Sequence, residues 1–586
     1  MCRRAAPGPR AEGAFLPLPP AGQGRAGALV RRAVCAAICT VALAGAPQAQ
    51  PDAPLAPWRA HPLDAQQVVQ AIAAAQPLDL GGAAISGLTL PHHRVARELI
   101  AAGLLSAAQG ARPERIVLLT PDHFKRSTRA FATTQRDFDT VLGRVPTDRR
   151  AAAALLRSPL VADSRLFERE HGLGELLPYV AHLFPGVPVL PLAVRIGASR
   201  AQWDHLVTRL APWVGPGTLV IQSTDFSHYL PLAQARRHDQ RMLNAIAAGD
   251  LDAIARARQP AQLDSRGSQY IQMRLQAQAF GAAPLVFGNF NSADRGATGA
   301  DSTTSYIAQV YAAAAADRVV APPGAVQTLC VAGDTFFGRH VATWLSDAAL
   351  RERVAAAWRR RLRGCPLLVN LEGVLSDEAA GAAPLQLVMA GDETLRWLRE
   401  LGVVALGVAN NHSRDLGDAA YVQMVQRLRA AGFQVLEQGQ AQMIGALRVT
   451  AWTDLDNTPS PRRDLLALPL PSSGEPRPDL AFMHWGREFA AAPGARERAL
   501  AQSLSAAGVA VIAGAHPHRA SRRIERRGAD TLVLHSLGNF VFDQRAPRAS
   551  GAVLQISRFE QGTVALRLIA LPDVFELGRE TAPPPR

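Results

Sequence analysis

The stretch Val403–Gly417, VVALGVANNHSRDLG, decides the fold of the second half of the chain. It opens with an apolar, valine-rich run, which predicts a buried strand. Asn410, Asn411, His412 and Asp415 follow this run. Open α/β sheets bind ligands at the carboxyl ends of their strands, so the stretch predicts a strand that delivers an amide, an imidazole and a carboxylate to such an edge. Turn chemistry is the alternative explanation of Asn-Asn-His-Ser.

Five other apolar runs in this half are also followed by polar side chains. We expect strands at Thr328–Val331, Leu367–Asn370, Leu480–Met483, Val509–Ile512 and Thr531–His535. The polar residues that follow are Asp334, Glu372, His484, the pair His516 and His518, and Asn539. Carboxylates that bridge two cations, with imidazoles in the remaining positions, are what a two-metal hydrolytic site requires. We interpret the segment 536–543 mainly as structure, a tight Gly-Asn turn between two strands.

The order of these motifs resembles the CapA family, the poly-γ-glutamate capsule biosynthesis proteins, over about Gln327–Pro572. The resemblance implies a calcineurin-like metallophosphoesterase fold, an α/β sandwich. It also implies the ligands of divalent metal ions, namely Mn, Fe or Zn: Asp334, Glu372, Asn411, His484, His516 and His518. It places His412 beside the leaving group as the catalytic acid, and we expect Asp415 to orient that ring.

The first motif of this half departs from the wider superfamily. Metallophosphoesterases usually carry Asp-x-His there, whereas this chain reads Asp334-Thr335-Phe336, and Glu372 stands where aspartate is commoner. CapA proteins share both departures, which leave the number of bound metal ions open.

The first half also alternates strands with helices, which predicts an α/β sheet. We expect strands at Ala83–Leu90, Arg115–Thr120, Val187–Val194 and Thr218–Gln222, and helices at Val95–Ala108, Arg200–Leu210 and Leu232–Ala248. Histidines follow three of these strands, in Pro91-His92-His93, in Pro121-Asp122-His123 and in the segment 223–229, which contains Asp225 and His228. Three imidazoles with an open position form a common metal site, suited to zinc, iron or copper.

This half resembles the Memo family, the AmmeMemoRadiSam system protein B group, from about Gly81 to Tyr311. The resemblance rests on the histidine motifs, on Glu170-His171 and on the closing Ser305-Tyr306, and it implies a fold related to class III extradiol dioxygenases. It makes His92, His123 and His228 the site histidines, with Asp225 as support. His93 stands where the family commonly has alanine, so the inward histidine of the pair stays open. The family's site cysteine is absent from Asp264–Gln269, which reads DSRGSQ.

The chain therefore reads as a two-domain α/β protein with an export signal. Arg31-Arg32 precede the apolar run Ala33–Ala44, which predicts a signal peptide cleaved near Ala49 and a periplasmic or secreted protein. We divide the chain into a leader and signal peptide (1–49), a linker with one helix (50–76), a Memo-like domain (77–316), a linker (317–326), a CapA-like domain (327–573) and a tail (574–586). Beyond the leader, only Cys330 and Cys365 remain, enough for one bridge.

Composition narrows the expected function. The formal net charge is +14, and almost all of the positive charge comes from arginine. No arginine stripe is interleaved with aromatic residues, so we expect no nucleic acid partner. We expect a metal-dependent, hydrolase-like protein of cell-surface polymer biosynthesis. Its partners would be an anionic polymer or phosphorylated substrate and the envelope biosynthesis machinery. Two alternatives stay open: a non-catalytic module that binds or exports a polymer or peptide, and iron-dependent redox chemistry in the first half.

Overall fold

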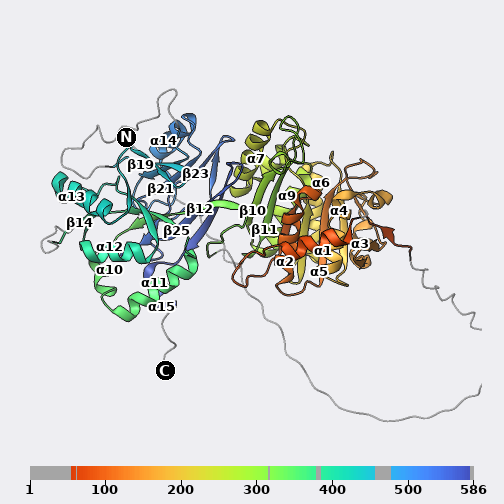
Figure 1. Cartoon of the computed structure of the whole chain (residues 1–586), viewed down its shortest axis with the longest axis horizontal. Helices are drawn as coiled ribbons and strands as arrows, with labels where there is room; N and C mark the ends of the chain where they lie inside the picture. The colour runs from red at the N-terminus through yellow and green to blue at the C-terminus, as the bar shows by residue number, and fades with distance from the viewer. Residues whose placement is uncertain (1–54, 61–62, 314–316, 378–384, 456–476, 581–586) are drawn as a thin grey trace, which may run out of the picture. The chain divides into compact units, whose positions relative to one another are not determined.

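The computed structural model describes residues 55–60, 63–313, 317–377, 385–455 and 477–580 (Figure 1). We call 55–313 the first half and 317–580 the second half. The predicted leader and signal peptide lie outside the described residues. Within the described ranges, no helix combines the length and the apolar character needed to cross a membrane.

The first half is built on an eight-stranded sheet in the order β10-β11-β2-β9-β3-β8-β4-β7. Its parallel centre is β2 (Gly87–Leu90), β9 (Thr218–Ser223), β3 (Arg115–Pro121) and β8 (Val189–Val194). The flanking strands are β10 (Pro284–Asn291), β11 (Ser305–Tyr311), β4 (Phe131–Thr133) and β7 (Val161–Asp163). The central strands are almost wholly buried, as a parallel sheet covered on both faces requires.

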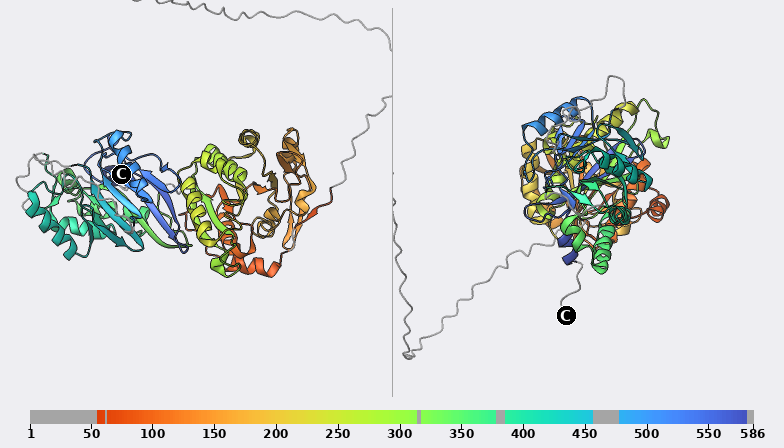
Figure 2. Two further views of the ribbon diagram at one scale, coloured as in Figure 1. Left: turned by 90° about the horizontal axis from the view of Figure 1, so that it is seen from above. Right: turned by 90° about the vertical axis from the view of Figure 1, so that its left-hand side faces the viewer.

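Helices cover both faces of this sheet (Figure 2). Along β3, Ile116 and Leu118 pack with helices α1 (Ala65–Ala74), α2 (Arg97–Ala108) and α5 (Leu177–Leu183). Val117 and Leu119 face the other way, toward α6 (Arg200–Leu210), α7 (Leu232–Ala247), α8 (Leu251–Arg256) and α9 (Arg266–Phe280). Because successive strand residues point to opposite faces, one apolar run supplies both cores.

The second half is a sandwich of two sheets. One has the order β17-β16-β13-β12-β25-β26, and its strands are β17 (Gln434–Leu436), β16 (Val403–Gly407), β13 (Leu367–Leu371), β12 (Ala325–Thr335), β25 (Gly551–Phe559) and β26 (Val564–Leu571). The other has the order β18-β19-β20-β21-β23-β22, and its strands are β18 (Ala441–Ile444), β19 (Leu447–Thr453), β20 (Leu480–His484), β21 (Val511–Ala515), β23 (Thr531–Leu534) and β22 (Glu525–Arg527). Val331, Leu368, Phe482 and Ala513 belong to one core between the sheets. The predicted α/β class with a sandwich in the second half is confirmed.

Helices close the outer faces of the sandwich. The first sheet packs against α11 (Ala348–Leu362), α12 (Gly391–Glu400) and α13 (Gly417–Ala430), and the second against α14 (Ala495–Ala506). The stretch Val403–Gly417 forms β16, the loop that follows it and the start of α13. Cys330 of β12 and Cys365, just before β13, form a buried disulfide.

Two segments expected to lie outside the two domains pack against them. The predicted tail begins with α15 (Val574–Glu580), where Val574, Phe575 and Leu577 are buried and Phe575 packs against Trp344. The predicted first linker contains α1, the helix expected there, and also β1 (Trp58–Arg59), which pairs with β5 (Phe138–Thr140). These segments bury enough apolar surface to be ordered, which their composition alone did not show.

The expected hairpin turn at Gly538-Asn539 is a crossing between sheets. β23 belongs to the second sheet, whereas β24 (Asn539–Val541) pairs with β12 of the first. Gly538 has a φ of 62°, and a Cβ there would collide with the backbone of Ser550 and Ala520. Only glycine fits this crossing.

Candidate metal centres

In the second half, strand ends from both sheets deliver buried polar side chains to one place. Asp334 lies at the end of β12 and Glu372 directly after β13; His484 ends β20, and His516 and His518 follow β21. All five are buried. We call this set the second-half centre.

The donor atoms of this centre lie close together. Ligand atoms of Glu372, His516 and His518 all lie within 4.8 Å of one another. His518 Nδ1 is 3.2 Å from Asp334 Oδ2, and His484 Nε2 is 3.7 Å from Glu372 Oε1. Two buried atoms, Glu372 Oε2 and His516 Nδ1, have no hydrogen-bond partner among the described residues. Buried ligand atoms without a hydrogen-bond partner fit a metal site, because a bound cation would satisfy them.

Charge in the second-half centre is unbalanced. Burial and the neighbouring Asp334 raise the pKa of Glu372 well above its usual value, whereas burial lowers the pKa of His516 to about 4. Burial also lowers the pKa of His484, so both imidazoles are neutral and able to bind a metal. Against its own burial, the carboxylates of Glu372 and Asp334 raise the pKa of His518 to about 9. A divalent cation can take the place of protons held by such a cluster.

The backbone at His516 and His518 is unusual. Their φ angles are 90° and 54°, in the left-handed region that non-glycine residues rarely adopt. The N–H of His516 donates to Asp334 Oδ2 at 2.9 Å, and His518 Nδ1 lies 2.8 Å from Asn539 Oδ1. Strained conformations held by such bonds are typical of functional sites. Asn539 therefore orients His518.

The loop after β16 places an imidazole next to this centre. His412 Nδ1 lies 2.8 Å from Asp415 Oδ2, which also accepts a bond from the Leu387 N–H at 2.7 Å. Asn411, predicted as a metal ligand, has its Oδ1 2.6 Å from His484 Nε2. Asn410 bonds the carbonyl of Leu371 at 2.8 Å and ties the loop to the neighbouring strand. The loop thus holds one imidazole with a fixed carboxylate partner beside the metal ligands.

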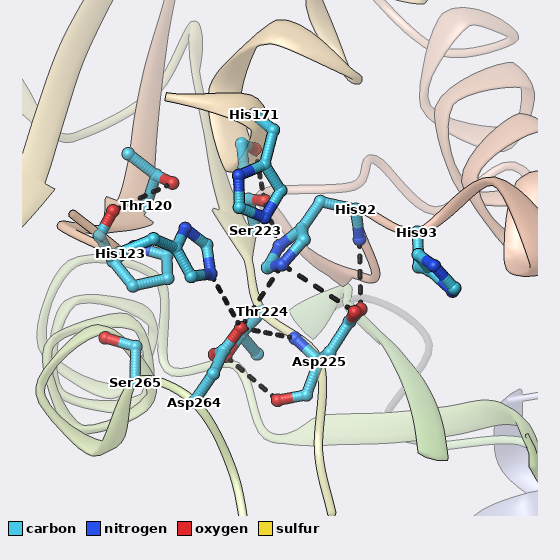
Figure 3. Close-up of polar contacts among 12 residues, drawn as sticks. His92, His93, Thr120, His123, His171, Ser223, Thr224, Asp225, Asp264 and Ser265 are labelled. Carbon is cyan, nitrogen blue, oxygen red and sulfur yellow. Dashed lines mark hydrogen bonds and ion pairs between the residues drawn. The ribbon is translucent and has the colours of Figure 1, made fainter. Parts of the chain in front are cut away.

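In the first half, three histidines and an aspartate converge at the edge of the sheet (Figure 3). His92 follows β2, His123 follows β3, His171 opens the short helix α4 (His171–Gly174) and Asp264 precedes α9. The ring centroid of His123 lies 4.8 Å from that of His92 and 4.1 Å from that of His171. We call these four residues the first-half centre.

His92 and His123 each have one ring nitrogen within hydrogen-bond distance of a residue behind the centre. His92 Nδ1 is 3.0 Å from Ser223 Oγ, and His123 Nδ1 is 2.5 Å from Glu170 Oε1. A Cβ at Gly172 would collide with Thr120 and press on the His123 ring, so only glycine lets α4 approach this closely.

Buried carboxylates set the protonation of this centre. Burial lowers the pKa of His92 well below its usual value. Against burial, Asp264 and Glu170 raise the pKa of His123 to about 10. Burial and the charge of Asp264 raise the pKa of Asp225, whose N–H also neighbours Asp264. The site is thus short of positive charge.

Two predicted ligands have a ring nitrogen bonded outside this group. His93 Nδ1 bonds the hydroxyl of Tyr306 at 2.5 Å and turns away from His92, and His228 Nδ1 bonds the carbonyl of Phe226 at 2.5 Å. Neither ring belongs to the group formed by His92, His123 and His171. Of the adjacent pair, His92 is the inward residue. Asp225, predicted as support, holds the His92 N–H at 3.1 Å.

Sequence reasoning missed His171 and Asp264 as site residues. Neither follows a strand: one lies in a helical turn after Glu170 and the other before a helix. The available signals were the Glu170-His171 pair within the resemblance and the position of Asp264, where the family's cysteine is absent.

Family models match both halves of the chain. The model of the Memo-like protein family matches residues 59–310. The model of the bacterial capsule synthesis protein PGA_cap matches residues 328–442 and 479–544.

Individual relatives divide in the same way. The "Capsule biosynthesis protein CapA" of Bacillus anthracis is 28% identical over 211 residues, 31% of this chain and 51% of that protein. A "MEMO1 family protein" of Thermotoga maritima is 28% identical over 170 residues, 28% of this chain and 61% of that protein. A "MEMO1 family protein" of Methanopyrus kandleri is 29% identical over 178 residues, 29% of this chain and 62% of that protein. The chain thus spans roughly half to three fifths of the length of these relatives. As its motifs predicted, the chain is similar to the Memo family in its first half and to the capsule synthesis family in its second.

Proposed function

We propose that the second half is a metal-dependent hydrolase of phosphate esters that acts on an anionic intermediate of surface-polymer biosynthesis. Similarity to capsule synthesis proteins links the protein to polymer biosynthesis. The observation that carries the hydrolase proposal is the buried donor set of Glu372, His516 and His518, in which two donor atoms lack a partner among the described residues.

The chain's own residues divide the work of such a reaction. Asp334, Glu372, His516 and His518 would hold a divalent ion, which supplies Lewis-acid polarisation of a phosphoryl oxygen when bound. His412 stands beside these ligands and would give a proton to the departing oxygen. Asp415, bonded to His412 Nδ1, keeps the other ring nitrogen directed at the substrate and stabilises the charged ring.

An exposed arginine gives the site an anion-binding rim. The guanidinium of Arg548 lies 4.0 Å from the centroid of the Phe489 ring, and that ring lies 5.8 Å from the ring of His518. Among the carboxylates that the structure describes, none forms an ion pair with Arg548. A cation held by stacking and left without a carboxylate partner suits a phosphorylated or polyanionic substrate.

Export is part of the proposal. The arginine pair and apolar run of the leader support a signal peptide, and a buried disulfide supports an oxidising compartment, either periplasmic or extracellular. Association with the envelope biosynthesis machinery would follow from that location.

The test is hydrolysis of a generic phosphomonoester and phosphodiester by metal-stripped protein reloaded with Mn, Fe or Zn. We expect His412→Ala to lower kcat by about 100- to 10,000-fold without a change in metal content. His340→Ala, at an exposed histidine of the same half, is the matched control. Full activity in both His412→Ala and Asp334→Ala would end the hydrolase proposal.

The rim has its own test. Arg548→Ala should raise KM for an anionic substrate about tenfold with kcat unchanged, as loss of a binding contact predicts. Arg545→Ala is the control, because Arg545 stacks on Phe575 instead. An unchanged KM in Arg548→Ala would remove this residue from the substrate site.

A further inference from the structure

We propose that the second half supplies a positioning residue to the first-half centre: Gln561, in the turn 560–563 between β25 and β26, holds the loop that follows β9. The proposal does not depend on the hydrolase function. Phe559, just before the turn, pairs with Ala325 at the start of β12, whereas Asp334 lies near the end of that strand. Most of the strand, about 30 Å of extended chain, therefore separates the turn from the second-half centre.

The turn after β25 is buried against the first half. Both halves belong to one compact unit of the chain. Phe559 and Ala565, on either side of the turn, belong to the same apolar core as Met242 and Ile307 of the first half. The side chain of Gln561 is itself buried. The turn is therefore packed as a core element of the first half.

Helix α7 of the first half fixes the register of the turn. The side-chain amide of Gln240 donates to the carbonyl of Val564 at 2.9 Å and accepts from the N–H of Val564 at 2.8 Å. Because β26 is the edge strand of its sheet, this amide satisfies backbone groups in the way that a further strand would. The residue before Gln240 is Asp239, whose carboxylate is thereby placed beside Gln561.

The buried carboxylate of Asp239 joins the turn to the loop after β9. Its Oδ2 accepts from Gln561 Nε2 at 3.2 Å, and its Oδ1 accepts from the hydroxyls of Ser227 at 2.8 Å and Ser305 at 2.6 Å. Among the residues that the structure describes, no arginine, lysine or histidine forms an ion pair with Asp239. Burial raises the pKa of Asp239, and the hydrogen bonds from Ser305, Ser227 and Gln561 oppose that rise. The charge of Asp239 thus depends on neutral donors, and one of them comes from the second half.

The two serines connect Asp239 to the first-half centre. The N–H of Ser227 donates to Ser305 Oγ at 2.8 Å, and the N–H of Ser305 donates to the carbonyl of Ser227 at 2.9 Å. Asp225, two residues before Ser227, accepts from the N–H of His92 at 3.1 Å. Holding the serines in place therefore holds Asp225 against His92, a residue of the centre.

The first test is amide hydrogen exchange of the full chain, measured by mass spectrometry. In Gln561→Ala, peptides that contain residues 226–227 or Ser305 should exchange about 10- to 100-fold faster than in wild type, because a buried charge loses a donor. Peptides of β3 should exchange as in wild type. Glu560→Ala is the matched control from the same turn, since the exposed Glu560 pairs with Arg295 instead. Unchanged exchange at the two sites, or an equal acceleration in β3, would overturn the positioning role.

The second test exchanges the two partners and looks for rescue. Gln561→Glu places a second carboxylate against Asp239, so the same peptides should exchange at least as fast as in Gln561→Ala. Adding Asp239→Asn restores an amide–carboxylate pair with the roles reversed, and exchange should return to within about threefold of wild type. A double variant that exchanges as fast as Gln561→Glu alone would overturn the direct pairing. Phosphoester hydrolysis by the second half should be unchanged in all these variants, so failure here and failure of the proposed function are distinguishable.

Discussion

The first-half and second-half centres each gather histidines and carboxylates, but from different arrangements of strands and helices. The first-half centre gathers its residues at one edge of a single sheet, from two strand ends and two helix starts. The second-half centre needs strand ends from two sheets, and two of its histidines have left-handed backbones. A site shared between sheets depends on how the sandwich packs, whereas a single-sheet site depends on loops and on hydrogen bonds behind its ligands. The comparison can be tested by removing one element at a time.

The largest effect on activity should come from Asp334→Ala. This carboxylate is fully buried, accepts the His516 N–H and the Asn370 amide, and contacts His518. We expect loss of the second-half ion, loss of measurable hydrolysis, and a free energy of unfolding lower by about 3 kcal/mol. Metal analysis, the phosphoester assay and urea unfolding would measure these. Glu352→Ala, at a surface ion pair, should change none of them; retained metal in Asp334→Ala would remove Asp334 from the ligands.

Reduction of the Cys330–Cys365 bridge should come next. The bridge closes a loop across a sequence separation of 35, and chain entropy predicts a loss of about 4 kcal/mol in the free energy of unfolding. Urea unfolding with and without reductant would measure the loss. The double variant Cys330→Ser/Cys365→Ser should be insensitive to reductant. The metal of the first half should stay bound, and its release on reduction would contradict the independence of the two centres.

Asp415→Asn should have a smaller effect, on rate alone. Asparagine keeps the shape but not the charge that holds the His412 ring, so we expect kcat to fall about 10- to 100-fold with metal content unchanged. Asp418→Asn, in the first turn of α13, is the control, since Asp418 pairs with Arg414. A fall in metal content in Asp415→Asn would show that this residue supports the ligands and not the acid.

The smallest effect should follow Tyr306→Phe. Its hydroxyl bonds His93, so its removal should lower the free energy of unfolding by about 1 kcal/mol and leave the metal content of the first half intact. Thermal unfolding and metal analysis would check both. Loss of metal in Tyr306→Phe would indicate that His93 contributes to the first-half centre.

The local sequence pattern was enough to predict the sheets and most residues of the second-half centre. Asp334, Glu372, His484 and His516 follow runs that are apolar enough to be strands, and parallel strands bring such ends together. The same rule could not find His171 or Asp264, because each enters from a helix start. Neighbouring residues of an extended chain point in opposite directions, so only one of His92 and His93 could face inward, and the sequence does not say which.

The other two wrong predictions, the hairpin turn and the tail, share one cause. Gly538-Asn539 has the composition of a hairpin turn, but a turn pattern cannot tell whether the next strand joins the same sheet or the opposite one. The segment after residue 573 has few apolar residues, yet three of them are buried and Phe575 packs against Trp344. Both outcomes depend on distant partners that no short window contains.

The disulfide has a practical consequence for preparing this protein. Cys330 lies on the strand that ends in Asp334, and Cys365 lies just before the strand that leads to Glu372. One covalent bond therefore limits how far the two carboxylate-bearing strands can slide apart. Material made in a reducing host and material made in an oxidising one would share a sequence but differ in metal affinity, so the redox history of a sample belongs beside any measured activity.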